Sequence, residues 1–328
     1  MPTNLPPEYH HAEKRYKSAS TPREKIETLE ELISTIPKHK GTDKLRADFR
    51  KRLSKMKSAS QSKKGKSKRE PAFHIVKEGA GQVAVIGSAN VGKSSLVATL
   101  TNASPEIGDY AFTTQKPQPG MMPVGNIKIQ LVDTPAISRD LFIPELFELI
   151  RGADLLLLVL NMQSDPFQQL EESLTMLKEQ HIIPLRHKDR HVPERRTVYL
   201  PFFILVNQCD EDDSDEDFDV FRELLNEDWS LLPVSAKNGR NLERLKQELF
   251  DRLQIIRIYS KTPGKDPDMQ EPFVLKHGST IEEFAEKLHK DFYANLKAAR
   301  VWGKDVFDGQ MVGRDHVLND GDIVELRI

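Results

Sequence analysis

The segment that most constrains the fold is Gly87-Ser88-Ala89-Asn90-Val91-Gly92-Lys93-Ser94, which fits the pattern GxxxxGK[ST]. The apolar run at residues 83–86 predicts a buried strand before it, and residues 95–100 predict a helix after it. In this context the backbone N–H groups and the helix N-terminus point at a bound phosphate. We therefore expect residues Ser88 to Ser95 to surround a polyphosphate, with Lys93 at the terminal phosphates and Ser94 on a magnesium ion. The alternative is a purely structural glycine turn.

Between residues 82 and 255, apolar strand-like runs alternate with helical patterns. We expect strands at 82–87, 127–132, 155–161, 202–207 and 231–234, and helices at 92–101, 144–151, 167–180, 217–226 and 241–253. This alternation is typical of the α/β class, with a mostly parallel, doubly wound sheet covered by helices on both faces. Ligands of such sheets bind at the carboxyl ends of the strands.

Charge is distributed unevenly along the chain. Residues 1–70 contain 19 Lys/Arg and 9 Asp/Glu, whereas the remaining residues contain 29 and 41. A basic arm on an acidic body favours a polyanionic partner, with RNA as the first candidate; we expect no DNA partner. The single cysteine, Cys209, excludes an internal disulfide, and the longest apolar run, residues 155–160, is too short to span a bilayer. With no signal-like N-terminus, these features predict a cytoplasmic protein without membrane contact.

The arm divides into three parts. Residues 1–20 are polar and predict a flexible N-terminus. Residues 21–57 predict a helical hairpin, because a capping box at 21–24 and an apolar stripe from Ile26 to Ile36 precede a second stripe from Leu45 to Met56. Residues 58–71 are rich in serine and lysine and predict a basic linker; a solvated tether is favoured over a phosphate-contacting patch.

Two further segments have a distinct character. Residues 259–328 predict a compact α+β module, with strands at 272–275, 297–302 and 322–328 and a helix at 280–290. Residues 184–200 predict a solvated basic loop. His187 and His191 are four residues apart within it, a spacing that binds metals on helices. The flanking Pro184 and Pro193 disfavour that metal site.

Four groups of residues follow the phosphate loop in the order found in guanine-nucleotide switch proteins. Thr114, or Thr113 as the fallback, would hold magnesium from a Gly/Pro-rich loop, and Asp133 at a strand end would reach the same ion through water. Ala136 offers a backbone N–H to the γ-phosphate. At later strand ends, Asn207-Gln208-Cys209-Asp210 and Ser235-Ala236-Lys237 would surround a base. The Asp210 carboxylate can accept two hydrogen bonds from a guanine edge, which adenine cannot donate.

The set GSANVGKSSL, FTT, DTPA, NQCD and SAK resembles the Obg/DRG branch of translation-factor-type GTPases. The resemblance extends outward: residues 22–57 are similar to the helical hairpin of the DRG group, and residues 259–328 to its TGS domain, a ubiquitin-like β-grasp fold. It implies a GTPase domain over residues 72–258, GTP and GDP as ligands, magnesium as cofactor, and association with ribosomes or RNA, with a protein cofactor as a further partner. The family's large inserted domain is replaced here by residues 184–200.

Departures from the family pattern leave two functions open. The DxxG glycine is Ala136, and the lysine of NKxD is Gln208. One hypothesis is a slow GTPase in which Lys93 and Thr114 act catalytically; Ile137 leaves no side chain to orient water, so a partner's arginine, Arg139 or a potassium ion on Asn90 would meet the developing charge. The other is a nucleotide-binding or degenerate scaffold that binds the ribosome without turnover. A small-molecule kinase is disfavoured because NQCD and SAK would then have no role.

Overall fold

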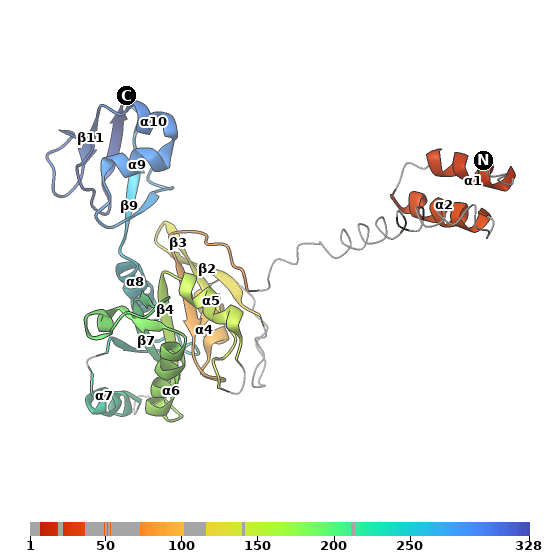
Figure 1. Cartoon of the computed structure of the whole chain (residues 1–328). Helices are drawn as coiled ribbons and strands as arrows, with labels where there is room; N and C mark the ends of the chain where they lie inside the picture. Colours follow the sequence, from red (N-terminus) through yellow and green to blue (C-terminus); the bar gives the residue numbers. More distant parts are fainter. Residues whose placement is uncertain are drawn as a thin grey trace. The chain divides into compact units, whose positions relative to one another are not determined.

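The computed structural model describes residues 7–18, 22–36, 49, 51, 53, 73–101, 116–139, 142–210, 214–227 and 229–328. The chain forms two units, residues 1–71 and residues 72–328 (Figure 1). Within the described residues, no helix is both long and apolar enough to cross a membrane.

The first unit contains two helices that pack against each other, α1 (Pro7–Ser18) and α2 (Pro22–Thr35). Tyr9 and Ala12 of α1 are buried together with Leu29 and Leu32 of α2. The expectation of a flexible N-terminus over 1–20 is therefore wrong for residues 7–18. The physical reason is the spacing of Tyr9, Ala12 and Tyr16, which places one apolar stripe on a helix that is otherwise charged.

The second helix of the predicted hairpin and the linker fall largely outside the described residues. Phe49 and Leu53 are the described members of that apolar stripe, and both pack against the core of α1 and α2. The linker prediction over 58–71 lies entirely outside the described residues.

The second unit begins with a six-stranded sheet in the order β2-β3-β1-β4-β7-β8. All neighbouring pairs are parallel except β2 with β3, so the predicted mostly parallel sheet is confirmed. The antiparallel edge strand β2 was not predicted. The strands are β1 (Gln82–Ile86), β2 (Gln118–Val124), β3 (Ile127–Asp133), β4 (Leu155–Asn161), β7 (Phe202–Asn207) and β8 (Leu231–Pro233).

Helices cover both faces of this sheet, and successive residues of β1 pack against opposite faces. Val83 and Val85 pack into one core, which includes side chains of α4 and α8, while Ala84 and Ile86 pack into the other, with side chains of α5, α6 and α7. A strand buried on both faces needs apolar residues at every position, and β1 has four in a row. The helices are α4 (Lys93–Leu100), α5 (Pro144–Gly152), α6 (Pro166–Glu179), α7 (Ser214–Leu224) and α8 (Leu242–Arg252).

The expected loop at 184–200 contains more regular structure than the sequence suggested. Two short parallel strands, β5 (Ile182–Pro184) and β6 (Val198–Leu200), pair with each other and flank the 3₁₀ helix η1 (Leu185–Arg190). β6 leads directly into β7 of the main sheet.

A separate five-stranded sheet, in the order β10-β9-β13-β11-β12, forms the C-terminal domain around a core that includes Phe284 of α9. Its first strand begins at Ile255, so the predicted boundary between residues 258 and 259 cuts through a strand and belongs before residue 255. The predicted helix at 280–290 is two helices. The elements are β9 (Ile255–Ser260), β10 (Phe273–Lys276), α9 (Ile281–Leu288), α10 (Lys290–Asn295), β11 (Ala298–Trp302), β12 (Gln310–Val312) and β13 (Ile323–Arg327).

Candidate nucleotide site

The phosphate loop connects the end of β1 to the start of α4, and its two glycines are required by geometry. Gly87 and Gly92 have φ values of 147° and 86°. A Cβ at Gly87 would lie 2.3 Å from the carbonyl oxygen of Val159, and one at Gly92 would lie 2.3 Å from Nδ2 of Asn207. A side chain at Gly87 would collide with the backbone of β4, and one at Gly92 would displace the Asn207 side chain, besides the strain of a positive φ at both positions.

Lys93 lies across the loop that it follows. Its Nζ donates to the carbonyl oxygens of Gly87 at 3.0 Å and Ser88 at 2.7 Å. The side chain is buried, and burial lowers the pKa of Lys93 to about 8, against an opposing attraction from Asp133. The amine is thus held in a poorly solvated place where a phosphate would supply the missing counter-charge.

Ser94 and Asp133 come from different strand ends and meet at the start of α4. The Ser94 hydroxyl donates to Oδ2 of Asp133 at 2.6 Å, and Asp133 is fully buried. A hydroxyl and a carboxylate side by side are hard oxygen ligands of the kind that magnesium prefers. This donor set fits a magnesium ion held between protein and phosphates; Thr113 and Thr114 lie outside the described residues.

The segment after Asp133 is fixed to the phosphate loop through its backbone. The N–H of Ile137 donates to the carbonyl oxygen of Gly87 at 3.2 Å, and the Thr134 hydroxyl donates to Val85 at 2.8 Å. Ala136 is buried and is not among the described residues with positive φ. Alanine therefore causes no backbone strain in this conformation.

Asn207 joins the phosphate loop to the loop that follows β8. Its Nδ2 donates to the carbonyl oxygen of Val91 at 2.9 Å, and its Oδ1 accepts from the N–H of Ala236 at 3.2 Å. Asn207 is buried, so these bonds hold three chain segments together at the carboxyl edge of the sheet. The structure thus gives Asn207 a linking role, and its predicted contact with the base stays a prediction.

Asp210, which follows β7, is oriented by residues of the loop that follows β8. One carboxylate oxygen accepts a short hydrogen bond from the hydroxyl of Ser235, which is fully buried. Asn238 donates from Nδ2 to the carbonyl oxygen of Asp210 at 3.2 Å and from its N–H to the Ser235 hydroxyl at 3.2 Å. A carboxylate fixed at this strand end is suited to accept two hydrogen bonds from a guanine edge.

Gln208 and Asn90 both adopt left-handed backbone conformations, with φ values of 65° and 62°. Nε2 of Gln208 donates to the carbonyl oxygen of Asn90 at 3.4 Å. A left-handed non-glycine residue costs roughly 1 kcal/mol, and such strain concentrates at functional sites. The Asn90 side chain is exposed and makes no hydrogen bond with the described residues, so it is available to a ligand.

The other predicted residues of the site differ in how far solvent reaches them. Ala89 and Ser95 are half-buried, at the loop and on α4, and Lys237 is exposed beyond Ala236. Arg139 is exposed. Sequence reasoning missed Asn238 and Arg240; the latter donates to the carbonyl oxygen of Cys209 at 3.3 Å and pairs with Asp215. The Asn-Gly turn after Lys237 is the pattern that marks them.

The described geometry defines a P-loop nucleotide-binding domain of the guanine-nucleotide class, followed by a second small domain. Comparison with known families agrees: the profile described as "50S ribosome-binding GTPase" matches residues 82–188, and that described as "TGS domain" matches residues 256–328.

Relatives match nearly the whole chain. An uncharacterized GTP-binding protein of Methanocaldococcus jannaschii is 32% identical over 93% of this chain and 92% of its own length. Developmentally-regulated GTP-binding protein 1 of Xenopus laevis is 26% identical over 92% of this chain and 98% of its own. The YchF GTPase structure of Schizosaccharomyces pombe, 12% identical, covers 77% of this chain and 99% of its own with a TM-score of 0.52, and shows the same fold. The chain belongs to the DRG-type family of GTP-binding proteins with a C-terminal TGS domain.

The alignment with the archaeal relative covers 365 positions, more than the 328 residues of this chain. That relative therefore contains residues that have no counterpart here.

Proposed function

We propose that this protein binds GTP and GDP with magnesium at the carboxyl edge of the main sheet and hydrolyses GTP slowly. The observation that carries the proposal is the meeting of three separate segments at one place. Ser94 lies 2.6 Å from Asp133, and Asn207 bonds both to the phosphate loop at Val91 and to the base-side loop at Ala236. A purely structural turn would not require this set of polar contacts.

The residues of this site have distinct roles in the proposal. Lys93 neutralises the terminal phosphates, the loop N–H groups from Ser88 to Ser95 bind their oxygens, and Asp210 selects guanine. Ser94, Asp133 and Thr114 would hold magnesium, which withdraws charge from the phosphate oxygens when it is bound. Asn90 is the proposed ligand of a potassium ion.

Slow turnover follows from what surrounds the γ-phosphate position. Ile137 is buried and apolar, and it stands where a water-orienting side chain is expected. Switch GTPases without assistance hydrolyse GTP at about 10⁻⁴ to 10⁻² s⁻¹, and we expect a rate in this range. A partner that supplies an arginine would raise it.

We place the function on ribosomes or RNA in translation. Two features support this: the description of the family that matches residues 82–188, and the excess of positive charge in residues 1–70. A protein cofactor is a second expected partner.

A second candidate is a scaffold of the same fold that binds ribosomes without appreciable turnover. Gln208 and Ala136 favour it, because they replace a charged lysine and a flexible glycine of the family motifs. Such a scaffold would have the same nucleotide site but would not hydrolyse GTP at an appreciable rate.

Calorimetry with GTP, GDP and ATP in magnesium tests the proposal. We expect guanine nucleotides to bind at micromolar concentration or below, with ATP at least about 100-fold weaker, because a site built to hydrogen-bond one edge rejects the other. Failure of GTP and GDP to bind below millimolar concentration would refute the enzyme proposal. Binding of GTP without phosphate release in single-turnover assays would select the scaffold.

A further inference from the structure

The segment between β5 and β6, residues 185–197, carries a concentration of positive charge that the nucleotide site does not use. We name it the basic loop. It contains five Lys/Arg and two Asp/Glu, whereas the chain from residue 71 onward is acidic. Its cationic side chains are solvent-exposed: Arg186, Lys188, Arg190, Arg195 and Arg196.

Four of these cations have no carboxylate partner among the residues that the structure describes. Two nearby carboxylates contact histidines instead: Glu194 lies 3.2 Å from His181, and Glu227 lies 2.8 Å from His187. Lys188, Arg190, Arg195 and Arg196 are left to face solvent. Four cations close together in the sequence, without an acid to neutralise them, favour binding of an external anion.

The loop is held in a fixed conformation by contacts from the domain beneath it. Arg151 of α5 donates to the backbone carbonyl oxygens of Arg196, at 3.0 Å, and of Gln180. The guanidinium carbon of Arg186 lies 4.7 Å from the centroid of the buried Trp229 ring, and the His187 ring meets the same tryptophan edge-on at 5.3 Å. A loop fixed in this way presents its charges with little loss of conformational entropy on binding.

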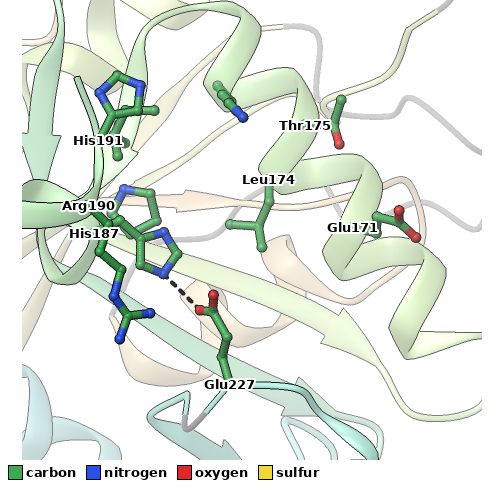
Figure 2. A pocket seen from close by; sticks show the side chains of 10 residues that line it. Glu171, Leu174, Thr175, His187, Arg190, His191 and Glu227 are labelled. Atoms are coloured by element: carbon green, nitrogen blue, oxygen red, sulfur yellow. Dashed lines mark hydrogen bonds and ion pairs between the residues drawn. The ribbon is translucent and has the colours of Figure 1, made fainter. Parts of the chain in front are cut away.

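A hollow of about 380 Å³ lies between the basic loop and α6 (Figure 2). Arg190 and His191 line it from the loop, and Lys178 and Thr175 line it from the helix, over an apolar floor that includes Leu174. The hollow therefore places further donors beside the exposed cations. Two carboxylates, Glu171 and Glu227, also line the hollow, so we expect phosphate contacts at the exposed side of the basic loop rather than inside the hollow.

We propose that the basic loop is an RNA-binding surface of the GTPase domain, which contacts the phosphate backbone through Lys188, Arg190, Arg195 and Arg196. This inference rests on the proposed ribosome or RNA partner and assigns a surface to it. Basic side chains supply sequence-independent affinity for nucleic acid through phosphate contacts and the release of counterions.

Charge along the chain favours RNA over an acidic protein segment. Two separate basic regions, residues 1–70 and the basic loop, are joined by an acidic remainder. Such a pattern matches a long, continuous polyanion better than one short acidic peptide, and the acidic remainder would repel non-specific attachment elsewhere.

The surface is separate from the nucleotide site. The basic loop precedes the first residue of β7, Phe202, whereas Asn207 at the last residue of that strand belongs to the nucleotide site. Five strand rises of 3.3 Å separate the two ends by about 17 Å. Changes in the basic loop should therefore leave GTP binding intact.

The test measures binding of a fluorescein-labelled RNA hairpin to the full chain by anisotropy, from 50 to 300 mM KCl. One variant replaces the four unpaired cations by glutamine: K188Q, R190Q, R195Q and R196Q. A matched control removes four exposed positive charges elsewhere in the GTPase domain: K116Q, K128Q, R222Q and R244Q. GTP affinity is measured for each protein, so that a folding defect is recognised.

We expect the basic-loop variant to bind RNA about tenfold more weakly at 100 mM KCl, and its log–log salt slope to fall by about 3, because four phosphate contacts are lost. The control should change affinity by less than about threefold. If both variants lose RNA affinity equally, the loss comes from the lower net charge of the protein and not from the basic loop, and the inference is overturned.

Two other outcomes separate this inference from the proposed function. If the wild-type protein and the basic-loop variant bind RNA equally well, the basic loop is not the RNA-binding surface. RNA binding would then be assigned to residues 1–70. Absence of RNA binding by the wild-type protein would overturn the proposed partner and the inference together. Loss of binding to phosphatidylserine vesicles without loss of RNA binding would assign the surface to a membrane and likewise refute the proposal.

Discussion

Burial of the Lys93 ammonium group leads to a specific prediction about the free energy of unfolding. Its side chain is 7% exposed, and burial lowers its pKa to about 8, although Asp133 acts in the opposite direction. The pKa of a lysine in an unfolded chain is about 10.4. At 1.36 kcal/mol per pKa unit, keeping this group charged destabilises the folded domain by about 3 kcal/mol at pH 7.

Lys93→Met removes the buried charge together with two hydrogen bonds, to the carbonyl oxygens of Gly87 and Ser88. Each of these bonds contributes about 1 kcal/mol. Without added nucleotide, we expect the variant to be more stable than the wild-type domain by about 1 kcal/mol. With GTP and magnesium the order should reverse, because only the wild-type protein gains free energy from the ligand.

The pH dependence follows from the sign of the shift. The folded pKa of Lys93 lies below the unfolded one, so unfolding takes up a proton between about pH 8 and pH 10.4. The destabilisation is fully present below pH 8 and disappears as pH rises through this window. The wild-type free energy of unfolding should therefore rise relative to that of Lys93→Met between pH 8 and pH 10.

Urea unfolding measures this difference. The two tryptophans report on different domains, Trp229 on the GTPase domain and Trp302 on the C-terminal domain, so a Trp302→Phe background isolates the relevant transition. Lys237→Met, at an exposed lysine beside the same site, is the control and should leave the midpoint unchanged. Identical midpoints and pH slopes for Lys93→Met and the wild type would refute the assignment of Lys93 as a buried cation.

Three further predictions test other parts of the structure. Asn207→Ala should lower the free energy of unfolding by about 2 kcal/mol and weaken GTP binding, because it leaves the carbonyl oxygen of the buried Val91 and the N–H of the half-buried Ala236 without this partner; unchanged urea midpoints would contradict it. Potassium chloride should accelerate single-turnover GTP hydrolysis relative to sodium chloride at equal ionic strength, and Asn90→Ala should abolish the difference; equal rates in both salts would exclude the potassium site. Deletion of residues 1–70 should reduce ribosome co-sedimentation and flatten its salt dependence, whereas sedimentation like that of the full chain at every salt concentration would reduce the arm to a tether.

The nucleotide site was predictable because its motifs are local and its topology is regular. A complete phosphate loop and strand-end motifs on parallel strands had to converge at one edge of the sheet, and Ser94 and Asp133 do meet there. The linking role of Asn207 was not predictable. It depends on the close approach of β7 to Gly92, a tertiary contact that no sequence period encodes.

The missed elements have physical reasons of their own. The strand β2 contains Pro119, Gly120 and Pro123, which oppose strand formation in isolation and are tolerated because β2 lies at an edge of the sheet. The helix α1 depends on burial of Tyr9 against α2, because its composition is otherwise polar. In both cases tertiary packing overrides weak local propensity.

If Asp210 reads guanine at this site, Asp210→Asn should change which nucleotide the protein binds. Ser235 donates to the carboxylate and Asn238 to the backbone carbonyl oxygen of Asp210, so we expect the substitution to exchange an acceptor for a donor without moving the loop. Competition calorimetry with GTP and xanthosine triphosphate compares the two bases in wild-type and variant protein. We expect GTP affinity to fall by at least about 100-fold while affinity for xanthosine triphosphate rises. An unchanged preference for GTP in Asp210→Asn would contradict it.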